Sequence, residues 1–250
     1  MHNAGYRALG LDWAYVPVAV PPDRLAVAIR GLGAASFAGL NVTIPHKEES
    51  LALASGASDV AREIGAANTL TPDGRGGFTA DNTDAVGFER AVDEVAPAAL
   101  DGARALLLGA GGSAQAVAWA LSNRGCHVTV ANRTPGRAAR LGEVIPFEAS
   151  AIDQAASSSG VIVNATSLGM GADGPPPELP LDSIRPGAVV VDLVYAPGGT
   201  PWLRAAEAEG ATAVDGRGML LHQGAASFSI WTGLEAPLEA MRAALEQPAA

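Results

Sequence analysis

The sequence predicts an α/β protein with two domains. Apolar runs of strand length alternate with segments of helical periodicity along most of the chain, which indicates mainly parallel sheets covered by helices on both faces. The chain has 250 residues, enough for two modest domains that each bury a core. Pro97 follows a predicted helix and marks a boundary between the two domains.

The elements of the first domain are separated by proline- and glycine-rich turns. Pro21-Pro22-Asp23 opens a helix in which Leu25, Ile29 and Leu32 recur at helical spacing, and Pro45 stops a strand. Pro72-Asp73-Gly74 is typical of a hairpin turn. We expect strands at 13–20, 37–44, 67–71 and 77–80, and helices from 21, at 48–54, near 59–64 and at 84–95.

The second domain repeats strand and helix more regularly. Glycine and proline crowd residues 171–180, which predicts an irregular loop there. We expect strands at 104–108, 127–131, 161–164, 188–193 and 212–214, and helices at 113–123, 135–141, 201–209, about 219–232 and 237–246.

Composition and charge exclude several classes of function. The formal net charge of −10 argues against nucleic-acid wrapping and adhesion to anionic lipid. Cys126 is the only cysteine and the four histidines show no close ligand pairing, so we expect no bound metal. No apolar run approaches the ~20 residues of a membrane span, and the N-terminus shows no signal peptide. We therefore expect a soluble, cytoplasmic protein without nucleic-acid or membrane partners.

Lysine is almost absent from the chain. The 16 basic residues comprise 15 arginines and one lysine, Lys47. Arginine stays charged, whereas a buried or suitably flanked lysine can release a proton near neutral pH. Lys47 is therefore a candidate for chemistry that arginine cannot perform; the alternative is a chance surface lysine.

Positive charge gathers in one part of the second domain. Residues 102–142 contain no Asp or Glu, while the other 209 residues carry 26 acids against 11 bases. A local charge of +5 in an acidic protein indicates a site for an anion, unless acids from elsewhere balance one helix face. The five basic residues are Arg104, Arg124, Arg133, Arg137 and Arg140.

A glycine-rich turn in this region fits a dinucleotide-binding site. It has the pattern G-x-G-x-x-A, follows the predicted strand at 104–108 and opens the helix at 113–123. The first glycine permits the turn, the second admits the pyrophosphate, and the final alanine lets helix and strand approach closely. The helix N-terminus then faces the phosphates. The residues of the turn are Gly109, Ala110, Gly111, Gly112, Ser113 and Ala114.

The end of the next strand indicates which dinucleotide binds. An NAD site usually places Asp or Glu there to bind the ribose 2′-hydroxyl, but residues 130–134 read Val-Ala-Asn-Arg-Thr. Arg133 and Arg137 can pair with a 2′-phosphate, and Thr134 can donate a hydrogen bond. We expect Asn132, which directly follows the strand, to contact the cofactor as well. We therefore expect a Rossmann-type, doubly wound parallel sheet that binds NADP(H).

Polar residues form three short motifs in the first domain. Residues 41–47 read Asn-Val-Thr-Ile-Pro-His-Lys, 67–69 read Ala-Asn-Thr, and 81–84 read Asp-Asn-Thr-Asp. We expect them at strand ends, where open parallel sheets place ligands. A lysine and an aspartate together can relay a proton to or from an alcohol.

Together with the glycine-rich turn, these motifs resemble the shikimate dehydrogenase family of the aromatic amino-acid pathway. The resemblance covers nearly the whole chain, and the ordered set is more specific than any one member. It comprises 41–47, 67–70, 82–84 with 87–88, 109–114, 132–134, 164–167 and 218–220 with Gln223. The resemblance implies NADPH-dependent, reversible reduction of 3-dehydroshikimate to shikimate by a monomer or homodimer.

The resemblance also implies roles for single residues, with Lys47 and Asp84 as the catalytic pair. When hydride reaches the substrate carbonyl, its oxygen needs a proton, and a lysine ammonium with a reference pKa of ~10.4 can donate one at pH 7. Asp84 favours the charged form of Lys47, whereas burial opposes it. The implied substrate contacts are Asn41, Thr43, Lys47, Asn68, Asp84, Tyr195 and Gln223. Further implied cofactor contacts are Thr166 and Ser167, with Gly218 and Met219 lining the nicotinamide.

Each assignment has a structural alternative. Thr43 and Asn68 would then satisfy backbone groups at strand ends, and Asp84 would cap the helix at 84–95. Tyr195 would be a packing residue, and Gln223 would hydrogen-bond within its own helix.

The resemblance gives the expected domains their roles. Members of the family carry a first strand and a Ser-x-Ser motif before the His-Asn pair found here at residues 2–3, and we expect this chain to lack both. We assign 1–83 to an N-terminally truncated substrate-binding domain, 84–98 to a connecting helix, 99–216 to the NADP-binding domain, and 217–250 to C-terminal helices that pack back toward the substrate domain.

Two other functions stay open. A quinate or broad-specificity dehydrogenase would share the lysine–aspartate pair, although the lack of an acid after Ala131 argues against it. The other is a catalytically weak, NADP-binding remnant or sensor.

Overall fold

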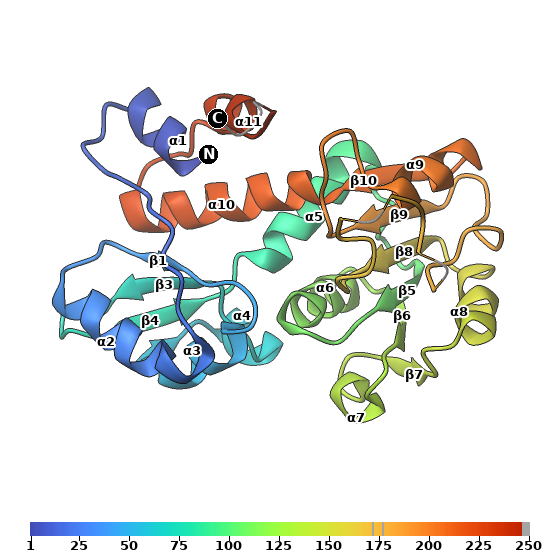
Figure 1. Ribbon diagram of the computed structural model, residues 1–250, viewed down its shortest axis with the longest axis horizontal. Helices are drawn as coiled ribbons and strands as arrows, with labels where there is room; N and C mark the ends of the chain where they lie inside the picture. Colours follow the sequence, from blue (N-terminus) through green and yellow to red (C-terminus); the bar gives the residue numbers. More distant parts are fainter. Residues whose placement is uncertain (172, 177, 247–250) are drawn as a thin grey trace. The chain divides into compact units, whose positions relative to one another are not determined.

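The computed structural model describes residues 1–171, 173–176 and 178–246 (Figure 1). Residues 172 and 177 of the predicted loop and 247–250 of the predicted C-terminal segment lie outside the described residues. The chain divides into two units, Met1–Gly87 with the segment from Leu220 onward, and Phe88–Met219. The division falls within two helices, α5 (Asp84–Val95) and α10 (Gly216–Thr232).

The first unit contains a four-stranded mixed sheet in the order β1-β3-β4-β2. Its strands are β1 (Leu40–Asn41), β2 (Gly56–Ala57), β3 (Thr69–Pro72) and β4 (Phe78–Asp81). The β3–β4 hairpin confirms the turn predicted at 72–74, and a hairpin makes its two strands antiparallel. β1 also pairs antiparallel with β3, so the expectation of a mainly parallel sheet is wrong for this unit.

Helices cover this small sheet and build its core. They are η1 (Pro22–Arg24), α2 (Leu25–Ala34), α3 (Lys47–Leu53) and α4 (Asp59–Ile64). Leu25 and Ile29, predicted from helical spacing, pack from α2 against Leu70 and Phe78 of the hairpin. Burial of such aliphatic and aromatic side chains contributes about 1.5–3 kcal/mol each.

A second apolar cluster joins α1 (His2–Ala8), α10 and α11 (Leu238–Glu246). Tyr6, Phe228 and Met241 are its large buried members. Helix α1 was not predicted from the sequence. Gly5 allows it to pack closely, because a Cβ atom there would lie 3.0 Å from the Phe228 ring.

The strand predicted at 13–20 is not formed. The structure describes all eight residues and assigns them no strand, while the strand predicted at 37–44 narrows to β1. Instead of a neighbouring strand, the Asn3 side chain holds Tyr15, donating to its carbonyl oxygen at 2.9 Å and accepting from its N–H at 2.6 Å. Without a ladder partner, the apolar run forms no strand and leaves Trp13, Val16 and Val18 exposed.

The second unit contains a six-stranded, fully parallel sheet in the order β10-β9-β8-β5-β6-β7. Its strands are β5 (Arg104–Leu108), β6 (His127–Ala131), β7 (Glu143–Ile145), β8 (Val161–Asn164), β9 (Val189–Asp192) and β10 (Thr212–Asp215). The strand order reverses between β5 and β8, so the predicted doubly wound sheet is confirmed. In such sheets ligands bind at the carboxyl ends of the strands beside this reversal.

Helices flank the parallel sheet, with α6 and α8 on opposite sides of it in Figure 1. They are α6 (Gly112–Asn123), α7 (Pro135–Ala138), α8 (Ala149–Ala156) and α9 (Pro201–Ala208). Ile152 of α8 and Trp202 of α9 pack against Leu106 and Val190 of the sheet. Strand β7 and helix α8 were not predicted. Among the described residues, no helix has the length and apolar character needed to cross a membrane.

A buried carboxyl group ends β9. Asp192 is 0% exposed and accepts hydrogen bonds from the Asn164 amide at 2.9 Å, the Val194 N–H at 3.0 Å and the Thr200 hydroxyl at 2.7 Å. Burial raises the pKa of Asp192 to about 6, with a smaller contribution from the Asp215 carboxylate, and the three hydrogen bonds oppose this rise.

We expect the stability of Asp192→Asn relative to the native protein to fall as the pH is lowered from 7.5 to 4. The folded-state pKa of about 6 lies above the ordinary 3.8, so the native carboxyl gains a proton on folding between these values. Protonation of Asp192 therefore adds as much as roughly 3 kcal/mol to the free energy of unfolding of the native protein at low pH, and the amide variant lacks this contribution. Urea unfolding of both proteins across this range tests this, and a pH-independent difference contradicts it.

Candidate functional site

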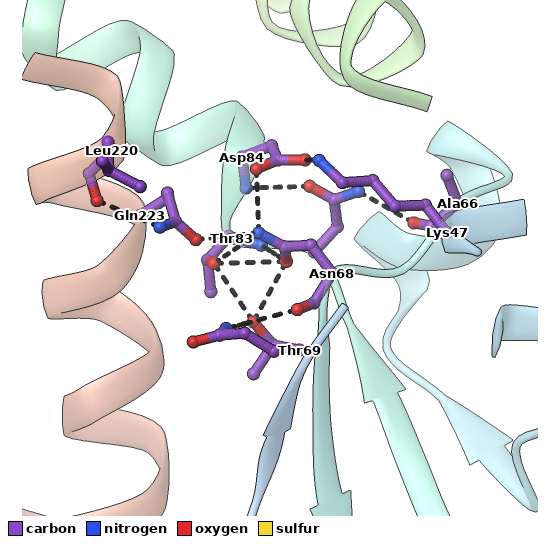
Figure 2. Close-up of polar contacts among 10 residues, drawn as sticks. Lys47, Ala66, Asn68, Thr69, Thr83, Asp84, Leu220 and Gln223 are labelled. Carbon is purple, nitrogen blue, oxygen red and sulfur yellow. Dashed lines mark hydrogen bonds and ion pairs between the residues drawn. The ribbon is translucent and has the colours of Figure 1, made fainter. Parts of the chain in front are cut away.

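Lys47 and Asp84 form a buried ion pair in the first unit (Figure 2). The Nζ–Oδ2 distance is 2.5 Å, and the two side chains are 9% and 5% exposed. Lys47 begins α3, where the helix dipole disfavours a cation, whereas Asp84 begins α5, where the dipole favours an anion. The carboxylate therefore compensates both for burial of the ammonium and for its position at a helix N-terminus.

Asn68 connects the ion pair to the rest of the cluster. Its amide nitrogen lies 2.8 Å from Asp84 Oδ1, 3.0 Å from Thr83 Oγ1 and 3.1 Å from Gln223 Oε1, as Figure 2 shows. Its amide oxygen accepts from the Thr83 N–H at 2.8 Å and from Thr69 Oγ1 at 3.0 Å. Two N–H groups thus serve three acceptors. Asn68 satisfies a backbone group, as the structural alternative expects, and also contacts the carboxylate.

Asn82, rather than the Asp84 side chain, supports the start of α5. Its side-chain oxygen accepts from the Asp84 N–H at 2.9 Å, and its amide donates to the Ala66 carbonyl at 2.8 Å. The two carboxylate oxygens of Asp84 are thereby directed to Lys47 and Asn68. Asn82 lies in a motif that the sequence singled out, but it was not predicted as a site residue.

Protein groups hold both ends of the Asn41 amide. Its oxygen accepts from Tyr15 Oη at 3.1 Å and Ser227 Oγ at 3.4 Å. Its nitrogen donates to the Asn68 carbonyl at 3.2 Å and Thr69 Oγ1 at 3.4 Å. Tyr15 and Ser227 were not predicted, because each lies in an apolar segment that gives no sign of a polar partner.

The structure brings together five of the seven predicted substrate residues. Gln223 joins the cluster through Asn68 and also donates to the Leu220 carbonyl of its own helix at 3.0 Å. Thr43 is exposed in the loop after β1. Tyr195 belongs to the second unit, where it is 55% exposed. The five connected residues are Asn41, Lys47, Asn68, Asp84 and Gln223.

The second unit has a pocket of about 430 Å³ beside the carboxyl ends of β5, β6 and β8. Gly109 has φ of +108°, and a Cβ atom there would lie 3.0 Å from the Ala165 carbonyl oxygen and 3.2 Å from Thr166 Cγ2. Only glycine meets both the backbone conformation and this close approach. The pocket is lined by Gly109, Ala110, Gly111, Asn132, Arg133, Phe147, Ala165, Thr166, Ser167, Leu168 and Glu178.

Seven predicted cofactor residues line this pocket, and the others take different places. The first turn of α6 contains Gly112, Ser113 and Ala114. Thr134 is the N-cap residue of α7, and Arg137 lies within that helix. Met219 is buried, and a Cβ atom on Gly218 would lie 3.1 Å from the Ala91 Cβ atom of α5. The seven lining residues are Gly109, Ala110, Gly111, Asn132, Arg133, Thr166 and Ser167.

Four residues of the pocket were not predicted. Ala165 lies inside the motif at 164–167 that the sequence singled out, and Leu168 follows that motif directly, so counting the whole motif and its next residue would have found both. Phe147 lies in a segment without a predicted element and Glu178 in the predicted irregular loop, and the fold alone brings them to the pocket.

Two of the five arginines in residues 102–142 bind protein groups away from the pocket. Arg124 binds Asp93 at 2.9 Å and Asp101 at 2.7 Å, so acids outside the basic region neutralise it. Arg140 donates to Gln115 on α6. Arg133 lines the pocket, which narrows the expected anion site to the β6–α7 turn.

The residues of this pocket fit a phosphate-bearing dinucleotide. The glycine turn leads into a helix of 12 residues, whose first N–H groups and dipole favour an anion. Arg133 adds a permanent positive charge at the end of β6, where an NAD site carries an acid. In the described part of the chain, no group of three or more His, Cys, Asp or Glu side chains is arranged to hold a metal ion.

Family models of known proteins match three parts of the chain. Family models match residues 1–70 (shikimate dehydrogenase substrate binding domain), 90–169 (shikimate/quinate 5-dehydrogenase) and 216–246 (shikimate 5′-dehydrogenase C-terminal domain). A shikimate dehydrogenase (NADP(+)) of Rubrobacter xylanophilus is 45% identical over 98% of this chain and 89% of its own length.

Solved structures give the same result. The Aquifex aeolicus shikimate dehydrogenase matches with a TM-score of 0.89 and 36% identity, covering 98% of this chain and 91% of that one. The Thermus thermophilus enzyme, solved with NADP(H) and shikimate, matches with a TM-score of 0.82 and 35% identity over 97% of this chain and 91% of its own. The chain therefore belongs to the shikimate dehydrogenase family.

Proposed function

We propose that this chain catalyses the reversible, NADPH-dependent reduction of 3-dehydroshikimate to shikimate, as a cytoplasmic monomer or homodimer. The observation that carries the proposal is the buried Lys47–Asp84 pair, because it holds a proton donor next to a carboxylate inside a polar cluster. The relatives' activity and the bound ligands of the Thermus structure support the same reaction and cofactor.

Lys47 and Asp84 divide the acid–base work. NADPH, when bound, supplies the hydride. As the substrate carbonyl gains negative charge on its oxygen, the Lys47 ammonium donates a proton to it, and in the reverse direction the neutral amine takes the proton back. Asp84 holds the Lys47 Nζ atom in place through a 2.5 Å contact with its Oδ2 atom.

Polar groups around this pair recognise the hydroxyls of the substrate. Asn68 and Gln223 present amide groups beside Asp84, and amides can both donate to and accept from ring hydroxyls. The resemblance adds Asn41, Thr43 and Tyr195 to this set. Because protein groups hold both ends of the Asn41 amide, we assign to Asn41 the support of Asn68 and Thr69.

The second unit is proposed as the NADP-binding domain, and the first as the substrate-binding domain. The first turn of α6 would hold the pyrophosphate, and Arg133, Thr134 and Arg137 the 2′-phosphate. Gly218 and Met219 are assigned to the nicotinamide by resemblance alone.

Replacing Lys47 with alanine should slow turnover strongly while leaving cofactor binding intact. We expect kcat to fall by roughly 10²- to 10⁴-fold, because the alkoxide-like oxygen loses its proton donor. The kcat of Lys47→Arg should fall by a similar factor, since arginine keeps the charge but does not release a proton near neutral pH. The decrease in NADPH absorbance with 3-dehydroshikimate measures turnover, and fluorescence titration measures the Kd for NADPH.

Three outcomes would contradict this function. A Lys47→Ala variant with native kcat would exclude the proton-donor role. Tight NADPH binding without turnover by the native chain would favour a sensor. Faster oxidation of quinate with NAD⁺ than of shikimate with NADP⁺ would favour the quinate alternative.

Arg133→Ala should weaken the binding of NADPH but not the binding of NADH. Loss of a charge-assisted contact with the 2′-phosphate, about 1.5–3 kcal/mol, corresponds to a roughly 10- to 150-fold higher KM for NADPH. The KM for NADH, which lacks that phosphate, should stay unchanged. Arg104→Ala is the matched control, since Arg104 lies in the same basic region but at the opposite, amino-terminal end of β5. Equal effects on both cofactors would show that Arg133 does not bind the 2′-phosphate.

A further inference from the structure

Three polar residues end neighbouring apolar strands of the parallel sheet. Asn164 of β8 pairs in register with Asp192 of β9, which pairs with Asp215 of β10. Asn164 and Asp192 are both 0% exposed. Burying two polar side chains at the ends of strands that otherwise read Val-Ile-Val and Val-Val-Val is costly unless every polar atom is paired.

A chain of hydrogen bonds leads from Asp192 to the dinucleotide pocket. The Asn164 amide nitrogen donates to Asp192 Oδ1 at 2.9 Å, and its oxygen accepts from Thr166 Oγ1 at 2.6 Å and the Thr166 N–H at 3.1 Å. The same amide nitrogen donates to the Leu168 carbonyl at 3.1 Å, and Thr166 Oγ1 accepts from the Leu168 N–H at 3.1 Å. Segment 165–168, which lines the pocket, is thus fastened to Asn164 near both of its ends.

The Asp192 carboxylate determines the orientation of the Asn164 side-chain amide. An ionised carboxylate only accepts hydrogen bonds, so it forces the NH₂ group of Asn164 toward itself and the amide oxygen toward Thr166. A rotated amide would present its NH₂ group to the Thr166 N–H, which is also a donor. Thr200 is 1% exposed, and its hydroxyl donates a hydrogen bond to the other carboxylate oxygen of Asp192 at 2.7 Å.

Segment 165–168 in turn packs against the glycine turn. Because a Cβ atom on Gly109 would lie 3.0 Å from the Ala165 carbonyl oxygen, little space separates the two sides. A shift of Ala165 and Thr166 would therefore change the pocket wall directly.

We propose that Asp192 is a positioning residue for the dinucleotide, which orients the Asn164 amide so that Thr166 and its neighbours form the pocket wall facing the glycine turn. The inference rests on the proposed function, because it takes the ligand of this pocket to be NADP(H). Asp192 itself does not line the pocket.

The test compares NADPH affinity among variants of the full chain, by fluorescence titration well below their melting temperatures. Asp192→Ala should raise the Kd for NADPH about tenfold or more, because the Asn164 amide loses the acceptor that orients it. Asp192→Asn should stay within about threefold of native, since its oxygen still accepts from Asn164 and the Thr200 hydroxyl can accept from its NH₂ group. The KM for 3-dehydroshikimate at saturating NADPH should not change in either variant.

Leu203→Ala is the matched control for destabilisation. Leu203 is buried on α9 in the same unit and makes no contact in this hydrogen-bonded chain through its side chain. It should lower the melting temperature while leaving the Kd for NADPH within about threefold of native. Equal weakening in Asp192→Ala and Leu203→Ala would reduce Asp192 to a structural residue and overturn the proposal.

The remaining outcomes also decide the matter. Native affinity in a folded Asp192→Ala overturns the proposal. If that variant does not fold, Asn164→Ala takes its place, because it removes the amide that Asp192 orients and should raise the Kd for NADPH about tenfold or more. Native affinity in Asn164→Ala would again overturn the proposal. Failure of the native chain to bind NADPH would overturn the proposed function itself, which distinguishes the two failures.

Discussion

The buried contact between Lys47 and Asp84 is the constraint on which the first unit depends. An ammonium at the start of a helix and inside the protein is unfavourable on both counts, and removal of one partner from such a pair costs about 3–5 kcal/mol. The surrounding contacts follow from this constraint. The Asn82 side chain accepts a hydrogen bond from the backbone N–H of Asp84, and the Asn68 amide donates one to the second carboxylate oxygen of Asp84. The carboxylate is therefore fully directed toward the side chains that are proposed to meet the substrate.

Both units use the same device to fix an amide. In the first, the Asn68 amide nitrogen donates to Asp84 Oδ1 at 2.8 Å; in the second, the Asn164 amide nitrogen donates to Asp192 Oδ1 at 2.9 Å. An asparagine can present either end of its amide, so a buried carboxylate beside it selects one orientation. Each oriented amide then holds a threonine, Thr69 or Thr166. Each aspartate thus shapes a site partly through its neighbour.

The sequence was most informative where one local rule decides the structure. Strands buried on both faces read as continuous apolar runs, so β5, β6 and β8 were predicted with the bounds they have. Lys47 stood out because lysine is otherwise absent, and the glycine turn stood out by its spacing. Tertiary pairing decided the rest. The apolar run at 13–20 lacks a ladder partner among the described strands, and α1 forms by packing against α10 and α11. Tyr15 and Ser227 became visible only through their contacts with Asn41.

A double-mutant cycle on Lys47 and Asp84 tests the central claim most directly. If the two side chains act as one acid–base unit, kcat/KM for 3-dehydroshikimate should fall steeply in Lys47→Ala and in Asp84→Ala, and the double variant should lose little more than the worse single variant. If the loss of transition-state stabilisation in the double variant instead equals the sum of the losses in the two single variants, the pair does not act as a unit and the account is contradicted.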